Sequence, residues 1–414
     1  MPQGETYIDI VWKQFKANTF AYAAVWAMIP LVGVAIFAPL LCSNQPLVFF
    51  EGDTTLFPWG RALFNPADPV DFLFNMALLG FIPWVMTVWL QNRRWKRLQA
   101  SAGRRMWVAS FEYILLTLVL GGIFAIPGVA PQNSFASRTF TEEQFRSSGR
   151  NYGIYAPIPF GATEQDLDSI FKPPRYRKHA QEARDANDTF PHWLGTDNVG
   201  RDVLARMVYG TRISITVGMV AVGIYLTIGS IAGALAGYFG GWLDILISRI
   251  IEVVLLFPSF FLILTLVALV GPSIYMIMVV IGITGWPTIA RLIRGEVLKQ
   301  RATDYVSAAQ ALGFSNSRII FRHILPNALS PALVAVPFGI AGAIITEAGL
   351  SLLGFGVRPP TPSWGTLLKL GSDNYTYWWL VLIPSLGIFF TVTVFNLIGS
   401  GLRDAMDPRL RATH

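Results

Sequence analysis

Long apolar runs constrain the fold of this chain more than any other feature. A membrane-spanning helix needs about 20 consecutive, mostly apolar residues. Eight segments reach roughly that length: 20–41, 72–90, 108–126, 213–238, 243–270, 273–290, 328–348 and 377–402. Only 14% of the 414 residues are charged, whereas a soluble domain carries about 25%. The sequence therefore predicts an all-α polytopic protein of the lipid bilayer, with about eight transmembrane helices.

Basic residues indicate how these helices are oriented. The loop 91–105 carries six basic residues and no acid, and the loop 291–322 is again rich in arginine. With eight spans, both loops fall on the same side as the two termini, which add Lys13, Lys16, Arg403, Arg409 and Arg411. Cytoplasmic loops are enriched in Lys and Arg. We therefore expect a multi-pass protein of the cytoplasmic (inner) membrane whose N- and C-termini are cytoplasmic.

Several classes of function lack the residues that they need. Cys42 is the only cysteine, so no intramolecular disulfide or cysteine metal cluster can form, and four scattered histidines indicate no metal site. The sequence contains no Gly-x4-Gly-Lys-Ser/Thr phosphate loop and no nucleophile–base motif. The net charge of +7 is explained by topology, because no basic helix with interleaved aromatics suggests a nucleic-acid site. We expect no enzyme activity, bound cofactor, metal or nucleic-acid partner.

The spans divide the chain into three regions. Residues 1–126 hold three spans, residues 127–210 form an external loop, and residues 211–414 hold five spans. The external loop mixes acidic and basic residues, and loops this long cross the membrane regardless of their charge. Its apolar and aromatic patch at 152–160 favours an ordered cap over a disordered linker.

A polar segment within the cytoplasmic loop 291–326 has the pattern of a short helix. Thr303 can cap it, since its hydroxyl can accept a hydrogen bond from an early backbone N–H, and Asp304 follows in the first turn. Gly313 can end it, because glycine adopts a positive φ most easily. Ser307 lies within it, and four residues at helical spacing predict one smooth face with small residues at its centre: Tyr305, Ala308, Ala309 and Leu312.

A second short helix is predicted after this glycine. Ser315 can cap it, Arg318 and Arg322 lie on it, and Pro326 marks the entry to the next span. Two short helices joined at an angle by glycine make a compact unit that can seat in a cleft of a cytoplasmic protein. The alternative is an amphipathic helix on the membrane surface, for which the alanines are poor anchors.

A charge-dense stretch lies just outside the fourth predicted span. Asp197, Arg201, Asp202 and Arg206 fall within ten residues, and the spacing of Asp202 and Arg206 predicts an ion pair on a helix. We expect these groups to have a structural role, and substrate binding by the carboxylates is the alternative.

Other polar or small residues lie within the spans themselves. Gly229, Gly233 and Gly237 recur every four residues, a pattern that lets two helix backbones approach closely, whether to slide or to pack statically. Arg249 and Glu252 lie three apart in the fifth span, and mutual pairing is favoured over a proton relay. A last set can line a transport pathway or simply bond neighbouring backbone: Thr391, Thr393 and Asn396.

Several motifs, in order, resemble one family of membrane proteins. The spacing Ala-Ala-x3-Gly-x11-Leu-Pro at 308–326 resembles the coupling loop of ABC-importer permeases, the membrane subunits of ATP-driven uptake systems. The blocks 193–214 and 346–365 resemble the second permease of the oligopeptide, dipeptide and nickel importers. The run 155–163 is similar to the branch that imports microcin-C-like peptides.

The resemblance implies an architecture and a set of partners. It implies a type I ABC-importer permease core, to which this chain adds a hairpin at 72–126. It further implies a heterodimer with a homologous permease, two cytoplasmic ATPase subunits that hold ATP and Mg²⁺, and an external substrate-binding protein. The permease would translocate peptides or peptide-like substrates by alternating access without changing them chemically.

The resemblance also assigns roles to residues. The loop 291–326 would transmit closure of the ATPase subunits to the membrane helices. The charged stretch 197–206 and Glu347, expected near the external end of the seventh span, would belong to an external gate. Ser307 stands where the family usually has glutamate, and His323 replaces a common apolar residue. These departures bear on an ionic contact at Ser307 rather than on docking itself.

Two other functions remain open from the residues alone. An ion-coupled secondary transporter needs a midplane ion site, often at broken helices in repeated halves, and the sequence displays neither repeated halves nor a midplane acidic cluster. A non-transporting membrane scaffold would not need a capped, glycine-broken cytoplasmic loop. The substrate itself is not specified by the sequence, since peptides, modified peptides, nickel complexes and glycans pass through related permeases.

Overall fold

The computed structural model describes residues 7–51, 53–66, 68–97, 102–135, 152–178 and 190–406. The chain forms two compact units. The first unit comprises Met1–Ala17, Trp26–Ile213 and Pro359–Gly387, and the second comprises Asn18–Val25, Ser214–Arg358 and Ile388–His414. Basic residues Arg409 and Arg411, and much of the external loop, lie outside the described residues.

The first unit contains the N-terminal helices and the external segments. Its helices are α1 (Tyr7–Ala17), most of α2 (Thr19–Leu41), α3 (Pro58–Ala62), α4 (Pro69–Arg97), α5 (Ala102–Phe124), η1 (Leu167–Ser169) and α15 (Trp364–Asp373). It also includes the first residues of α7 (Val203–Phe239) and of α16 (Trp379–Met406). Its strands are β1 (Val48–Glu51), β2 (Thr54–Leu56) and β3 (Tyr152–Ile154), which form an antiparallel sheet in the order β2-β1-β3.

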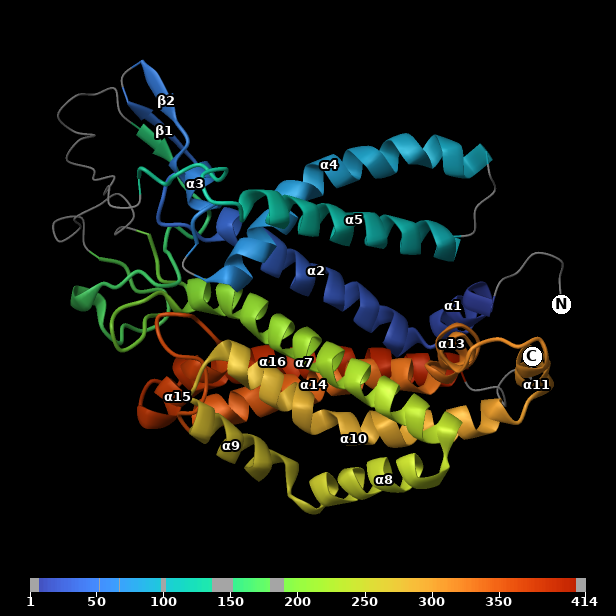
Figure 1. Cartoon of the computed structure of the whole chain (residues 1–414). Coiled ribbons are helices and arrows are strands. Elements are labelled where there is room, and N and C mark those ends of the chain that lie inside the picture. The colour runs from blue at the N-terminus through green and yellow to red at the C-terminus, as the bar shows by residue number, and fades with distance from the viewer. Residues whose placement is uncertain are drawn as a thin grey trace. The chain divides into compact units, whose positions relative to one another are not determined.

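The added hairpin consists of α4 and α5, which lie side by side (Figure 1). Apolar packing joins them at Gly80, where the backbone of α4 comes close to Leu116 and Leu120 of α5. Two polar contacts also cross the pair. Trp84 Nε1 donates to the carbonyl of Ala109 at 2.7 Å, and Tyr113 Oη donates to the carbonyl of Ala77 at 2.8 Å.

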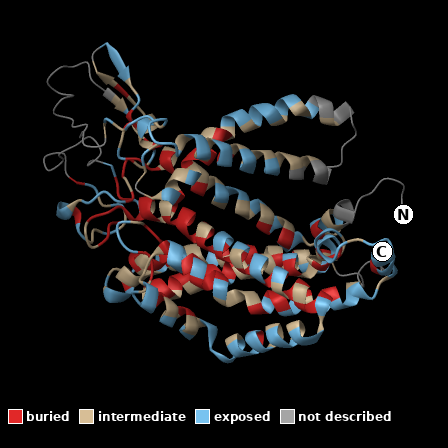
Figure 2. Cartoon of the chain, in the orientation of Figure 1, coloured by how far each residue is buried: buried red, intermediate tan, exposed pale blue. Residues whose placement is uncertain are grey.

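The second unit is an assembly of long helices around α10 (Ile274–Arg301). This helix packs against α8 (Gly241–Leu256), α9 (Ser259–Val270) and α14 (Ser330–Leu352). Figure 2 shows buried residues along α10 and mostly exposed residues along α8. The remaining elements are α11 (Asp304–Ala311), α12 (Asn316–Arg318), η3 (Ile319–Ile324), α13 (Leu325–Ala328), and most of α7 and α16.

The three glycines of α7 confirm the predicted close approach of two helices. A Cβ atom at Gly229 would lie 2.8 Å from the carbonyl oxygen of Trp286, and one at Gly237 would lie 2.9 Å from that of Arg294. Gly233 approaches the carbonyl of Ala290 in the same way. Three glycines at intervals of four thus face three α10 carbonyls at the same interval, and no side chain fits between the two backbones.

All eight apolar segments form helices, but not all of them as predicted. Six helices are long and apolar enough to cross a membrane: α2, the first 24 residues of α4, α7, α10, α14 and α16. The predicted span 243–270 is not one straight helix, since α8 and α9 are bent by 87° at a break and form either a broken span or a re-entrant loop. The apolar part of α5 is limited to Val108–Phe124, shorter than the others.

Candidate functional site

The candidate coupling loop, residues 291–326, leaves the end of α10 and returns to the membrane through α14. Helix α11 begins at Asp304, two residues after α10 reaches its C-cap at Ala302. After a turn, the chain winds through α12, the π-helical turn η3 and α13, and α14 follows at Ser330. The predicted pair of short helices is therefore present, and Pro326 lies in the last turn before α14.

Gly313 makes the turn between the two helices, as the sequence predicts. Its φ is +73°, a conformation that strains any residue with a Cβ. The N–H of Gly313 donates to the carbonyl of Gln310 at 2.9 Å, and the N–H of Phe314 donates to the carbonyl of Ala309 at 3.1 Å. This pair of bonds is a Schellman motif, which satisfies carbonyls at the end of α11 and fixes the direction of the outgoing chain.

The two predicted caps differ in outcome. Ser315 caps the second helix as expected, because its Oγ accepts a bond from the N–H of Arg318 at 3.4 Å. Thr303 is the N-cap of α11, but the prediction for its hydroxyl is wrong. The Thr303 Oγ1 instead donates to the carbonyl of Gln300 at 2.5 Å, and thereby fastens the start of α11 to the end of α10.

The two sides of α11 differ in burial. Val306 and Ala309 are buried on its inner side, and η3 contributes the buried Ile319, Ile320 and Ile324. Ala309 therefore does not belong to the exposed face, and the predicted face is wrong at this position, because the Schellman turn folds η3 back against it. The exposed face consists of Tyr305, Ala308 and Leu312, with Asp304 and Ser307 exposed beside it.

A stack of side chains supports the turn from the other helix. The Arg318 guanidinium lies 4.1 Å from the ring centroid of Phe314. The His323 ring is stacked on Phe314 at 5.8 Å between centroids, so Phe314, directly after Gly313, contacts both Arg318 and His323. Arg322 and Pro326 are exposed on the same outgoing segment.

Polar contacts also connect the loop to the helices that enter the membrane. Tyr238, at the end of α7, donates through its Oη to Asn316 Oδ1 at 2.9 Å. About two helical turns before the end of α10, Arg294 binds Asp244 of α8 with two hydrogen bonds, of 2.5 and 2.7 Å. The coupling loop is thus continuous, through α10, with the glycine contact of α7 and with the broken span.

The external charged stretch is organised around Asp197 in the first unit. Its Oδ2 accepts a bond from Arg201 Nε at 2.7 Å and a second from Arg206 NH1, and its Oδ1 accepts the N–H groups of Val199 and Arg201. Burial of the Asp197 carboxyl tends to raise its pKa, but the charges of Arg206 and Arg201 outweigh burial and hold the pKa below its usual value. The cluster is a buried structural unit.

Asp202 does not pair with Arg206, so the predicted ion pair is wrong. Asp202 immediately precedes α7, and its Oδ1 accepts the N–H of Ala205 at 2.7 Å as a helix cap. Its Oδ2 lies 2.9 Å from Nδ1 of His192, whose ring stacks on Phe160. Since the Asp202 carboxylate is held at the helix end, Arg206 turns to Asp197 instead.

The other predicted site residues lie in the second unit. Glu347 is buried near the end of α14, where Ser351 Oγ donates to its Oε1 at 2.7 Å. Thr391 of α16 is buried, Thr393 is partly buried and Asn396 is exposed. The three polar residues of α16 therefore do not share one environment, and their role in a pathway stays a prediction.

Comparisons with known proteins match both ends of the chain. Residues 229–412 match the family of binding-protein-dependent transport system inner membrane components, and residues 6–54 match the N-terminal transmembrane domain of oligopeptide transport permease C. The dipeptide transport system permease protein DppC of Alkalihalophilus pseudofirmus is 44% identical over 53% of this chain and 73% of its own length. The chain belongs to the family of binding-protein-dependent transport system inner membrane components.

Two further relatives are also transport system permease proteins. The glutathione transport system permease protein GsiD of Pectobacterium atrosepticum is 42% identical over 53% of this chain and 74% of its own length. The DppC protein of Haemophilus influenzae is 38% identical over 62% of this chain and 86% of its own length. A solved structure of the MetNI methionine ABC transporter aligns at a TM-score of 0.41 with 17% identity, over 49% of this chain and 97% of that chain.

The permease also contains a buried ionic site that the sequence analysis missed. Arg212 of α7 is fully buried and binds two helices of the first unit. Its Nε donates to the carbonyl of Ala35 in α2 at 2.6 Å, and its NH1 donates to Asp71 Oδ1 and Asn75 Oδ1 of α4 at 2.9 and 3.0 Å. Arg212 and Asp71 each lie one residue before a predicted span. This shared position at a span end was the only signal in the sequence that could have suggested their pairing.

Helix α4 lies outside both matched segments of the permease, 6–54 and 229–412. The added hairpin nevertheless supplies the counter-ion for Arg212, and the rings of Phe74 and Tyr209 flank the guanidinium at 5.3 and 5.2 Å. The hairpin is thus an integral part of the first unit.

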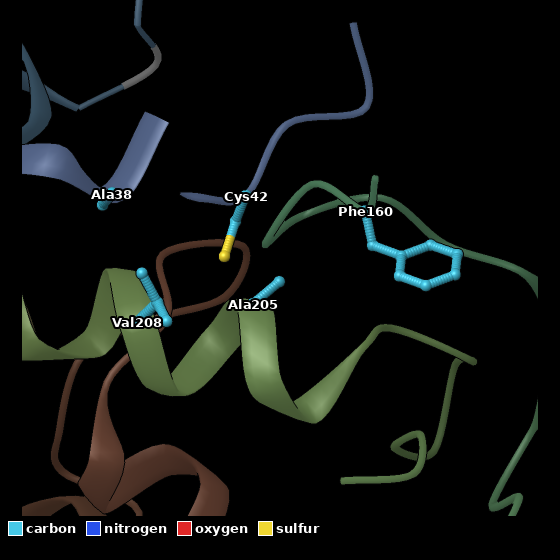
Figure 3. Close-up of a cluster of buried hydrophobic side chains, with 5 residues drawn as sticks. All are labelled: Ala38, Cys42, Phe160, Ala205 and Val208. Atoms are coloured by element: carbon cyan, nitrogen blue, oxygen red, sulfur yellow. The ribbon is translucent and has the colours of Figure 1, made fainter. Parts of the chain in front are cut away.

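The single cysteine of the permease is a packing residue. Cys42 is buried in a cluster with Ala38, Phe160, Ala205 and Val208, and Figure 3 shows its sulfur directed toward α7. Partly buried apolar residues surround this cluster. In the described part of the chain, no group of three or more His, Cys, Asp or Glu side chains is arranged to hold a metal ion.

Proposed function

We propose that the chain is the permease subunit of an ATP-driven importer that translocates peptides or peptide-like substrates across the cytoplasmic membrane by alternating access. The family membership supports the transport role. The names of two relatives, a dipeptide and a glutathione transport system permease protein, support the substrate class. The chain would move its substrate without changing it chemically.

One observation carries the mechanism. The exposed face of Tyr305, Ala308 and Leu312 is held on a helix whose start is bonded to α10 and whose end is fixed by the Gly313 turn. Rigid connections at both ends of α11 allow a movement of this helix to be transmitted to its neighbours. A push on α11 would act on α10, which the glycines of α7 and Asp244 of α8 contact directly.

The proposed complex contains three further subunits and a binding protein. A homologous permease would complete a heterodimer, and two cytoplasmic ATPase subunits would bind ATP and Mg²⁺ and receive the coupling loop. The chain itself would bind no cofactor. In this arrangement both termini and the coupling loop are cytoplasmic, as the basic loops favour. The Asp197 cluster, Asp202 and Glu347 would stabilise an external gate beneath the binding protein.

Purification of the tagged chain from its native membrane in mild detergent tests this proposal. Mass spectrometry of the co-purifying proteins should identify a second permease and one or two proteins with a phosphate loop. A preparation that contains only this chain, and that still transports after reconstitution, would overturn the proposal and favour an ion-coupled transporter. A proton-gradient dependence that survives loss of the ATPase subunits would have the same meaning.

A further inference from the structure

The broken span formed by α8 and α9 carries a charged pair on its outward side. Arg249 NH1 lies 2.5 Å from Glu252 Oε2, three residues further along α8. The two side chains are 73% and 51% exposed, so the described part of the chain leaves both largely uncovered. The predicted mutual pairing is confirmed, but the pair lies on an open surface rather than inside the packed helices.

The charged pair lies within a continuous exposed stripe of α8. Residues three or four apart share one face of a helix. The stripe comprises Trp242, Ile245, Arg249, Glu252, Val253 and Leu256, all of them exposed. Ile251, on the side of α8 turned toward the rest of the second unit, is 3% exposed.

The stripe leads to the break between the two helices. Helix α8 ends at Leu256, Phe257 is extended and Pro258 precedes α9, whose axis differs by 87° (Figure 1). Proline has no N–H to donate to the carbonyls of the preceding turn, and the first N–H groups of α9 have no partner within that helix. Leu256 and Phe257 are themselves exposed, so the free backbone groups lie at the open end of the stripe.

Neither the Arg249–Glu252 pair nor the broken backbone at Phe257–Pro258 is compatible with direct contact with lipid. Charged side chains within membrane spans face the bundle interior or a water-filled cavity. Broken backbone at membrane depth is tolerated only where protein buries it or where it lines such a cavity. Only four residues of α8, 253–256, separate Glu252 from the break, so a single aqueous space adjoining the stripe would accommodate both. Discontinuous helices of this kind form substrate sites in other transporters.

We propose that the α8 stripe and the break at Phe257–Pro258 form one wall of the translocation pathway, where Arg249 and Glu252 bind the charged ends of a short zwitterionic peptide in transit. The inference rests on the proposed function. The Arg249 guanidinium suits the terminal carboxylate of the peptide, since such pairs form parallel hydrogen bonds. The Glu252 carboxylate accepts bonds from its terminal ammonium group. In the empty pathway the two side chains neutralise each other, as observed.

Cysteine labelling in the reconstituted complex tests the inference. Arg249→Cys and Leu256→Cys, each made with Cys42→Ala, are treated with a charged, water-soluble methanethiosulfonate. Leu118→Cys is the control, because Leu118 is also an exposed residue, on the apolar surface of α5. The cysteine thiolate attacks the sulfenyl sulfur of the reagent and displaces its sulfinate. Thiolates form in water, so both stripe cysteines should react at least about tenfold faster than the control cysteine. A free dipeptide should slow labelling of Leu256→Cys, which keeps both Arg249 and Glu252, and its N-acetylated, C-amidated form should not.

Two results would overturn the inference. One is labelling of Arg249→Cys as slow as that of Leu118→Cys. The other is equal protection by the free and the end-blocked dipeptide. ATP-driven peptide uptake by the unmodified complex is measured in parallel, which separates the two proposals. Uptake without stripe labelling contradicts only this inference, whereas a complex that takes up no peptide contradicts the proposed function.

Discussion

Arg212 of α7 and Asp71 of α4, 141 residues apart in the sequence, form a buried ion pair at 2.9 Å. The side chain of Arg212 is completely buried, and Asn75 and the carbonyls of Ala35 and Ile36 occupy its other donors. The pair joins the added hairpin to the first span and to α7. The hairpin is therefore held by a polar contact whose loss leaves a charge without a partner.

Removal of one partner should be costly. Asp71→Asn leaves the Arg212 charge uncompensated and should lower the free energy of unfolding by about 3–5 kcal/mol. The double variant Asp71→Leu/Arg212→Met should recover much of that loss, because an apolar pair needs no counter-ion. Thermal unfolding in detergent measures both variants, with the exposed Asp53→Asn as a control. Equal stability of Asp71→Asn and the control would refute this role.

The Asp197 cluster should make the stability of the fold depend on pH. The folded-state pKa of Asp197 is lowered, so its contribution to stability is complete above the unfolded value and is lost as pH falls through the folded one. The melting temperature should therefore change little through Asp197 between pH 7 and 5 and fall below about pH 4. Asp197→Asn should be less stable at pH 7, with a shallower loss in acid. An unchanged acid slope in this variant would count against the cluster.

The contact between α7 and α10 can be tested with a single methyl group. Gly233→Ala places a Cβ against the Ala290 carbonyl and 2.9 Å from Ile293 Cβ, and should destabilise the fold by about 1–3 kcal/mol. Gly223→Ala is the matched control, since the same change in the same helix meets no heavy atom within 4 Å. Unfolding in detergent should separate the two variants. Equal effects would mean that the close approach does not constrain this helix pair.

The turn at Gly313 should be required for coupling rather than for insertion. Proline fixes φ near −65° and has no N–H, whereas Gly313 has a φ of +73° and donates to Gln310. Gly313→Pro should therefore redirect α11 and reduce peptide uptake by at least about tenfold, which corresponds to about 1.4 kcal/mol of coupling. Gly295→Ala in α10 is the control, because it meets no heavy atom within 4 Å. Normal uptake by Gly313→Pro, at equal membrane levels, would contradict the coupling role.

Local signals in the sequence were sufficient for the loop and for most spans. Gly313 and Ser315 act on backbone groups within five residues, so residue type and spacing predict their conformations. The same local reasoning failed at Thr303 and Asp202. Each has a competing partner, the Gln300 carbonyl and the His192 ring, and helical spacing alone does not reveal these partners.

Features that depend on contacts between distant parts of the chain could not be predicted from the sequence. The pairing of Arg212 with Asp71 depends on the packing of three helices, which no spacing rule specifies. The predicted span 243–270 contains Pro258, but the 87° break there depends on how α8 and α9 each pack against α10. The burial of Ala309 likewise depends on η3 folding back. The division into residues 1–126, 127–210 and 211–414 remains a prediction.

The central claim is that the exposed face of α11 transmits ATP hydrolysis to the membrane helices. Its most direct test is peptide uptake per ATP hydrolysed in proteoliposomes that contain the complete complex, with one new carboxylate at either of two adjacent positions. Ala308→Glu puts this charge at the centre of the exposed face, whereas Ser307→Glu puts it at the adjacent exposed position, where the coupling-loop pattern that this loop resembles has glutamate. We expect Ala308→Glu to lose uptake while ATP hydrolysis continues, and Ser307→Glu to stay coupled. Normal uptake per ATP by Ala308→Glu would contradict the central claim.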